Sequence, residues 1–149
     1  MHLNVYLSGE IHTDWRDQIA QGVQRQNLPV TLSAPITDHD ASDNCGAVIL
    51  GDEDNPFWKD HKAAKINAIR NRTLIEQADV VVVRFGDKYR QWNAAFDAGY
   101  AAAMGKPIIT LHSAEQTHAL KEVDAAALAV SETPEGVVSI LAYVIGSQG

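Results

Sequence analysis

Asp97 is the residue of this sequence whose surroundings most suggest chemistry. It lies in WNAAFDAGYAAAMGKPII, residues 92–109, among small and apolar side chains and just before Gly99 and Tyr100. An acid near a helix N-terminus can simply point at solvent, where the helix dipole stabilises it by about 0.3–1 kcal/mol. However, the many alanines around Asp97 indicate a closely packed helix that leaves a solvated acid little room. We therefore expect a chemical role for Asp97, and we expect the helix N-terminus to keep its carboxylate ionised.

Cofactor and metal motifs are absent from the sequence. It contains no G-x-G-x-x-G or G-x-x-x-x-G-K-[ST] fingerprint for nucleotide phosphates, and no H-E-x-x-H, C-x-x-C or G-x-S-x-G motif. The only cysteine, Cys45, excludes an internal disulfide and a multi-cysteine metal site, and it suits a reducing compartment. We predict no cofactor and no metal, which leaves carboxylate chemistry.

An acidic segment, Asp38, His39, Asp40 and Asp43, allows three interpretations. It can be a solvated turn, the wall of an active site, or a metal site, and the last is the weakest because a lone His with Asp neighbours is common on surfaces. His39 could also supply a proton, because an unperturbed imidazole titrates near neutral pH.

Trp15, Trp92 and Arg84 each allow two interpretations. The tryptophans can belong to the core, but both flank segments that follow strands and could stack on a nucleobase. Arg84 ends an apolar run, where it can pair with Asp87 or Asp97, or contact a phosphate or an acidic substrate.

Short Val- and Ile-rich runs alternate with helical periodicity along the chain. The predicted strands are Leu3–Ser8, Pro29–Ala34, Asp79–Phe85, Pro107–His112 and Ala127–Val130. The predicted helices are Thr13–Gln26 with Thr13 as N-cap, Trp58–Gln77, Trp92–Met104 with Gly105 as its stop, Ala114–Val123 and Pro134–Ile145. The polar segment Pro35–Pro56 is too long for an idle connection and is predicted to be a functional loop rather than a disordered one.

This alternation predicts an α/β fold with a doubly wound, five-stranded parallel sheet in the flavodoxin-like order 2-1-3-4-5 and helices on both faces. Ligands of such sheets bind beyond the carboxyl ends of strands 1 and 3. The segments at that place are SGEIHTDW and GDKYRQWNAAFDAGY.

Composition limits the partners. The 149 residues fit one domain, residues 1–149, and the formal net charge of −7 argues against a nucleic-acid partner, so a small molecule is expected. No apolar run reaches the roughly 20 residues of a membrane helix, and the start MHLNVYLSGE lacks the layout of a signal peptide. We predict a cytoplasmic protein without a membrane partner.

The chain resembles the nucleoside 2-deoxyribosyltransferase superfamily in VYLSGEIHTDWR, RTLIEQADVVVVRF and FDAGYAAAMGKPII. It is similar to the YtoQ-type branch along nearly its whole length, including TDHDASD, FWKDHKAAKINAIRNRTLIE and FGDKYRQWNAAFDAGY. The superfamily normally has a glutamate that attacks the anomeric carbon of a 2-deoxynucleoside to give a glycosyl-enzyme, and the resemblance places this role on Asp97. It also implies that Tyr6 orients the nucleophile, although a core aromatic is the alternative, and it suggests a homodimer or larger homo-oligomer.

The sequence departs from the superfamily pattern at three positions. Asp97 is one methylene shorter than glutamate, and amides, Asn71 and Gln91, stand where many members carry acids. Asp87 is the nearest ionisable substitute for Gln91. An amide binds a base but cannot protonate it, so no residue is assigned as the general acid, with His39 as a candidate.

The resulting hypothesis is an enzyme that cleaves or transfers at the N-glycosidic bond of a nucleoside or nucleotide. Asp97 is the predicted nucleophile and Tyr6 orients it. The predicted substrate-binding residues are Ser8, Gly9, Glu10, Trp15, Asn71, Asp87, Trp92 and Asn93. The alternative is a nucleotide-binding or sensing module of the same fold without catalytic activity.

Overall fold

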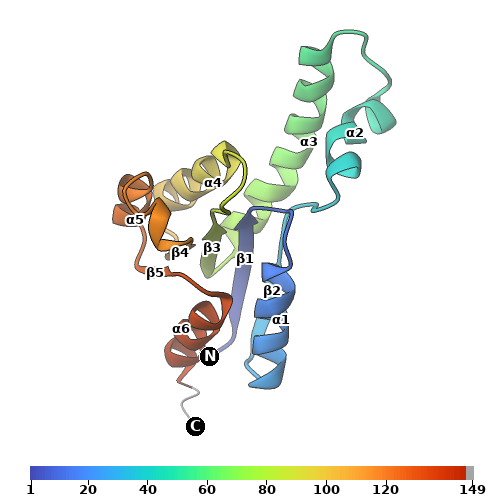
Figure 1. Ribbon diagram of the computed structural model, residues 1–149. Helices are drawn as coiled ribbons and strands as arrows, with labels where there is room; N and C mark the ends of the chain where they lie inside the picture. Colours follow the sequence, from blue (N-terminus) through green and yellow to red (C-terminus); the bar gives the residue numbers. More distant parts are fainter. Residues whose placement is uncertain (147–149) are drawn as a thin grey trace.

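Five parallel strands form one sheet in the order β2-β1-β3-β4-β5 (Figure 1). The computed structural model describes residues 1–146. The strands are β1 (Leu3–Gly9), β2 (Val30–Ser33), β3 (Val80–Arg84), β4 (Ile108–Leu111) and β5 (Ala129–Ser131). The predicted α/β class and strand order are confirmed.

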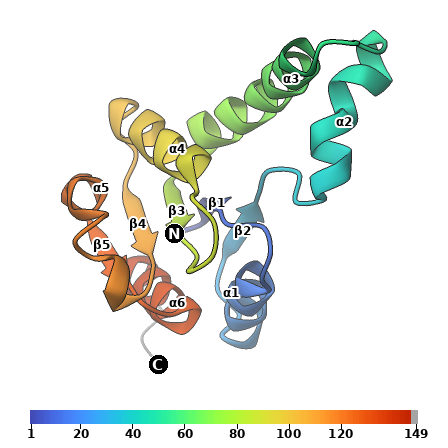
Figure 2. The same ribbon diagram turned by 45° about the horizontal axis from the view of Figure 1, so that its top comes forward.

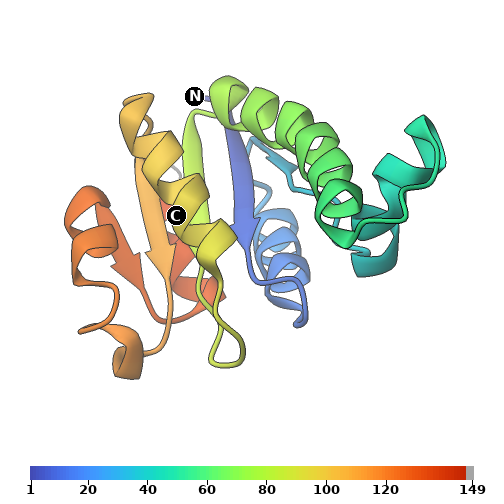
Figure 3. The same cartoon turned by 90° about the horizontal axis from the view of Figure 1, so that it is seen from above.

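Helices cover both faces of this sheet (Figures 2 and 3). The first layer contains α1 (Trp15–Arg25) and α6 (Pro134–Ile145), and the second contains α3 (Pro56–Gln77), α4 (Trp92–Ala103) and α5 (Lys121–Ala126). Side chains alternate along a strand, so β1 serves both layers. Val5 and Leu7 pack in the core cluster of α1 and α6, whereas Tyr6 packs in the cluster of α3 and α4.

The tips of β1 and β3 meet closely at the point where the strand order reverses. Val80 to Val83 are all buried, which confirms the prediction of a strand covered on both sides. Gly9 ends β1 with a φ of +110°, and a Cβ on it would lie 2.1 Å from the carbonyl oxygen of Arg84. Only glycine fits this contact, which sets where the chain leaves the sheet.

A helical arm projects from the body. It includes a helix within Pro35–Pro56, so the prediction of a loop over this segment is wrong. The arm consists of α2 (His39–Leu50) and the N-terminal half of α3 (Figure 1). Asp38 caps α2, because its Oδ1 accepts a hydrogen bond from the backbone N–H of Ala41 at 2.8 Å. Gly46 lets the two helices approach closely, since a Cβ there would lie 2.5 Å from the Cβ of Lys62. The helix therefore depends on a cap and on a tertiary contact, not on a clear apolar stripe.

Other boundaries also differ from the predictions. The predicted helix over residues 114–123 is instead a 3₁₀ turn, η1 (Ala114–Gln116), followed by the short α5. Thr13 is not the cap of α1; Asp14 holds that position without a side-chain cap bond, because the Thr13 hydroxyl donates to Glu10 instead. None of the helices in residues 1–146 combines the length and the apolar composition that a membrane-spanning helix needs.

Candidate active site

A pocket of about 870 Å³ opens beyond the carboxyl ends of β1 and β3, where the topology predicts a ligand. Its walls are the β1–α1 loop, the start of α2, one face of α3, the β3–α4 loop and the first turns of α4. On α3 the lining includes Ala63, Ala64 and Ala68, whose short side chains leave the space open. Asn67 and Asn71 of the same helix add amides to this wall.

Asp97 lies on α4 at the pocket, and its Oδ2 accepts a hydrogen bond of 2.6 Å from the Ser8 hydroxyl of β1. Burial raises the pKa of Asp97, and the Ser8 hydrogen bond acts against that rise. This corrects the expectation that helix amides alone keep the acid ionised. Asp97 is the sixth residue of α4, beyond the first turn where the helix dipole is effective. The hydroxyl of Ser8 is therefore the group that stabilises the carboxylate.

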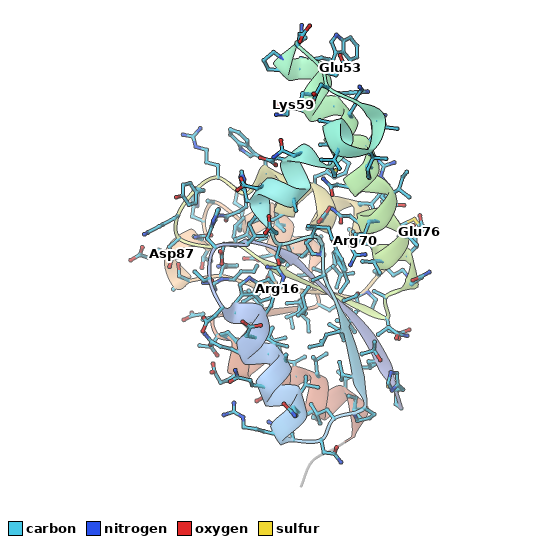
Figure 4. The ribbon with its side chains drawn as sticks, turned by 90° about the vertical axis from the view of Figure 1, so that its right-hand side faces the viewer. Arg16, Glu53, Lys59, Arg70, Glu76 and Asp87 are labelled. Atoms are coloured by element: carbon cyan, nitrogen blue, oxygen red, sulfur yellow. The ribbon has the colours of Figure 1, made fainter. Side chains whose placement is uncertain are left out.

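Tyr6 is fully buried, and its hydroxyl has no hydrogen-bond partner. Burial first and the charge of Asp97 second raise the pKa of Tyr6, and the positive charges of Arg16 and Arg70 act in the opposite direction. The phenol is therefore a neutral donor without an acceptor. In Figure 4, Arg16 and Arg70 both lie where the arm joins the body.

Arg16 is a site residue that the sequence reasoning missed. Its guanidinium donates to the carbonyl oxygens of Leu7, Gly9 and Glu10 at 3.0, 3.1 and 2.6 Å. Burial lowers the pKa of Arg16 to about 10. These bonds fix the backbone that leads from β1 into the pocket wall. The position of Arg16 within the quoted segment VYLSGEIHTDWR was the available signal.

Glu10 lines the pocket, but its carboxylate faces its own loop. Oε1 accepts from the backbone N–H groups of His12 and Thr13, and Oε2 accepts from the Thr13 hydroxyl at 2.5 Å. Trp15 is placed in the core rather than on the pocket wall, with 2% of its surface exposed. Its indole N–H donates to the Glu10 carbonyl at 2.8 Å, so the ring fixes the backbone of this loop and is not free to stack on a base.

The other predicted pocket residues are divided between the wall and the surface beside it. Gly9, Asn71, Trp92 and Asn93 line the pocket, and Trp92 is 72% exposed. The Oδ1 of Asn71 is buried and has no partner. Asp87, in contrast, accepts hydrogen bonds from Ser113 and Gln116 beyond the β3–α4 loop.

The polar residues near β3 do not supply an acid to the pocket. Gln91 is used to shape the loop, since its Oε1 accepts from the Gly86 N–H at 2.9 Å and its Nε2 donates to the Lys88 carbonyl at 2.5 Å. Arg84 is half-buried, its Nε has no partner, and it forms no ion pair within the described residues.

Aromatic rings from three segments meet at the pocket rim. The rings of His12 and Tyr89 have centroids 4.8 Å apart, and those of His12 and His39 are 6.5 Å apart. The Nδ1 of His39 lies 3.3 Å from Asp43 Oδ2. His39 and Asp43 thus belong to the pocket wall, one of the interpretations of the acidic segment. His12 was missed although it lies in the quoted loop SGEIHTDW. Over residues 1–146, no group of three or more His, Cys, Asp or Glu side chains could hold a metal ion.

The sheet order and the pocket define the class of protein: a doubly wound α/β protein with a carboxylate at its topological switch point. Solved structures share this fold at low sequence identity. A conserved protein from Enterococcus faecalis V583 is 12% identical with a TM-score of 0.67, and the match covers 97% of this chain and 99% of that one. The 2-deoxyribosyltransferase from Bacillus psychrosaccharolyticus is 15% identical with a TM-score of 0.56 (93% and 95% covered). The Clostridium botulinum CMP N-glycosidase is 14% identical with a TM-score of 0.54 (95% and 98% covered).

Sequence comparison identifies the family. Residues 6–145 match the family described as Nucleoside 2-deoxyribosyltransferase YtoQ. The chain is also 41% identical over 148 residues to the "Uncharacterized protein YtoQ" of Bacillus subtilis (strain 168), covering 99% of this chain and 100% of that protein. The chain therefore belongs to the YtoQ family, as its resemblance to that branch implied.

Proposed function

We propose that the protein cleaves or transfers at the N-glycosidic bond of a nucleoside or nucleotide, with Asp97 as the nucleophile. The observation that carries this proposal is the placement of the Asp97 carboxylate at the pocket, held by the Ser8 hydroxyl at 2.6 Å. Family membership and the shared fold with a deoxyribosyltransferase and a nucleotide N-glycosidase support it.

The chemistry follows from these positions. A carboxylate oxygen of Asp97 attacks the anomeric carbon, the bond from that carbon to the base nitrogen breaks, and its electron pair leaves with the base. Water or a second base then attacks the glycosyl ester and regenerates the carboxylate. Tyr6 is the orienting group, because its unpartnered hydroxyl can donate while Asp97 carries charge. Asn71, Trp92 and Asn93 bind the substrate.

His39 is our proposed donor of the proton that the departing base needs. It lines the pocket, and Asp43 faces its Nδ1 at 3.3 Å, which leaves Nε2 as the donating atom. A carboxylate behind an imidazole orients the ring.

The test is a panel of deoxynucleosides, ribonucleosides and their monophosphates, with and without an acceptor base, followed by chromatography of the released bases. We expect turnover that Asp97→Asn lowers about 1,000-fold or more, because loss of a nucleophile removes the covalent route. The matched control is Asp17→Asn, an exposed acid of α1. Unchanged turnover in Asp97→Asn excludes this nucleophile, and product formed only with an acceptor base identifies a transferase.

A nucleotide-binding module without catalysis is the second candidate, and one observation favours it. The carboxylate of Glu10 is used within its own loop, and Asn71 and Gln91 are amides, so these positions offer no proton to a leaving base. Thermal stabilisation by nucleotides without any release of free base would support this function over the enzymatic one.

A homo-oligomer belongs to the same proposal. The tip of the arm exposes large apolar side chains, and α4 exposes Phe96 at 60% beside a Gly99 that has open space around it. The apolar residues of the tip are Val48, Ile49, Leu50, Phe57 and Trp58. Such patches are typical of protein interfaces. Light scattering should give a dimer or larger species, and a monomer at working concentration would contradict it.

A further inference from the structure

Three cationic side chains line the pocket. Lys65 and Arg72 lie on α3, and Arg90 lies on the β3–α4 loop. Lys65 and Arg72 are seven residues apart, which places them on the same face of the helix, about 10 Å apart along its axis. The cations therefore come from two different walls of one cavity.

These cations lack carboxylate partners. The ion pairs found among residues 1–146 are His39–Asp43, Lys62–Glu53 and His112–Asp124, and none includes the three pocket cations. Two of them lie near aromatic rings instead: the guanidinium carbon of Arg72 is 5.6 Å from the ring centroid of Tyr100, and that of Arg90 is 5.9 Å from the ring centroid of Trp92. Ring contacts orient a guanidinium but leave its N–H groups available.

Among the described residues, the four acids of the same lining form no ion pair with these cations. Glu10 is occupied by hydrogen bonds from its own loop, and Asp43 is paired with His39. Asp97 is the reacting group, so Asp60 is the remaining carboxylate of the lining. The concentration of unpaired cations at one cavity is unexpected in a chain whose formal net charge is −7.

We propose that the pocket takes a phosphorylated substrate, a nucleoside 5′-monophosphate, and that Lys65, Arg72 and Arg90 bind its phosphate. The inference rests on the proposed function for the nucleoside part of the ligand. Arginine forms paired hydrogen bonds to phosphate oxygens, and lysine supplies a point charge. The cavity of about 870 Å³ is at the upper end of the usual range of ligand pockets, roughly 300–1,000 Å³, which leaves room for the phosphate beside the nucleoside.

The experiment measures binding, not turnover, so that it does not depend on catalysis. Calorimetry or thermal shift on the full chain carrying Asp97→Asn compares each of the common ribo- and deoxyribonucleoside 5′-monophosphates with its parent nucleoside. We expect the best monophosphate to bind roughly 10- to 100-fold more tightly than its nucleoside, the range of one or two charge-assisted hydrogen bonds. Added salt should reduce this advantage, because exposed charges are screened.

Charge-neutralising variants locate the phosphate. We make three variants, Lys65→Gln, Arg72→Gln and Arg90→Gln. At least one of them should lower the ratio of monophosphate affinity to nucleoside affinity about 10-fold, while the affinity for the nucleoside stays unchanged. Lys88→Gln is the matched control, an exposed cation of the same loop that does not line the pocket. Circular dichroism verifies that each variant is folded.

The outcomes separate this inference from the proposed function. If no monophosphate binds more tightly than its nucleoside, or if none binds, the inference is wrong, while the proposed function stands if a nucleoside is turned over. If monophosphates bind through these cations but are never cleaved, the inference stands and the enzymatic function fails. Equal losses of affinity in the Lys88 control and the pocket variants would also overturn it, because the effect would then be one of net charge.

Discussion

Replacing Ser8 with alanine tests how far the Ser8 hydroxyl opposes the effect of burial on the pKa of Asp97. The Ser8 hydroxyl donates to Asp97 Oδ2 at 2.6 Å, a short distance typical of a charge-assisted bond. Burial raises the pKa of Asp97, and this bond opposes the rise, so its removal should raise the pKa further. Ser8 is fully buried, and alanine leaves the backbone and the packing of β1 in place.

The size of the effect follows from the bond. A hydrogen bond to a charged group contributes about 1.5–3 kcal/mol. Losing it shifts the protonation equilibrium of the carboxyl about 10-fold or more toward the acid, because 1.36 kcal/mol corresponds to a factor of ten. If the proposed function holds, turnover should rise with pH about one pH unit or more later than in the wild type, since only the carboxylate is a nucleophile.

Carbon-13 NMR of aspartate carboxyls measures this directly and requires no turnover. The Asp97 resonance is assigned by its disappearance in Asp97→Asn and is titrated in the wild type and in Ser8→Ala. The matched control is Ser139→Ala, an exposed serine of α6 whose hydroxyl donates to the Glu135 carbonyl. A Ser8→Ala midpoint that stays in place or moves to lower pH would refute the reasoning.

Three further predictions follow from the described contacts. Asp97→Asn should be more stable than the wild type at neutral pH. Because the pKa of Asp97 is raised in the folded state, this difference in stability should appear as pH rises above about 4 and level off above the folded pKa. Denaturant unfolding at several pH values checks this, and a variant that is less stable at every pH contradicts it. His39→Asn should lower turnover about 100-fold with His12→Asn affecting it less, and the reverse order would assign the proton to His12. Asp124→Ala should lower the free energy of unfolding by about 1–3 kcal/mol, because it leaves the imidazole of His112, which is 1% exposed, without the carboxylate 3.0 Å from its Nε2. An unchanged midpoint in urea would show that this pair does not stabilise the fold.

The central sheet could be predicted because its signals are local. β3 is a continuous valine run, and Pro134 and Gly105 mark helix ends by their backbone preferences. Helix α2 was missed because it depends on the Asp38 cap and on close contact at Gly46, and neither feature produces a periodic pattern of apolar residues. In such a case the tertiary contact, not the periodicity, decides the structure.

Part of the candidate site could be predicted because the strand order could be predicted. The sheet order brings Gly9, Asn71 and Asp97 to one pocket because they follow β1 and flank β3. The contacts of Trp15 and Arg16 could not be predicted, since they depend on which backbone carbonyls lie within reach. Both side chains donate to the carbonyl of Glu10, a contact that exists only after the loop has folded.

Mass spectrometry of a trapped intermediate tests the central claim most directly. The protein is incubated with nucleosides and monophosphates that carry fluorine at the sugar 2-position, which slows breakdown of a glycosyl ester by withdrawing electrons. We predict that the intact mass increases by one fluorinated sugar, that the adduct maps to the peptide containing Asp97, and that Asp97→Asn gains nothing. An adduct on another residue, or normal release of base by Asp97→Asn, would contradict the account.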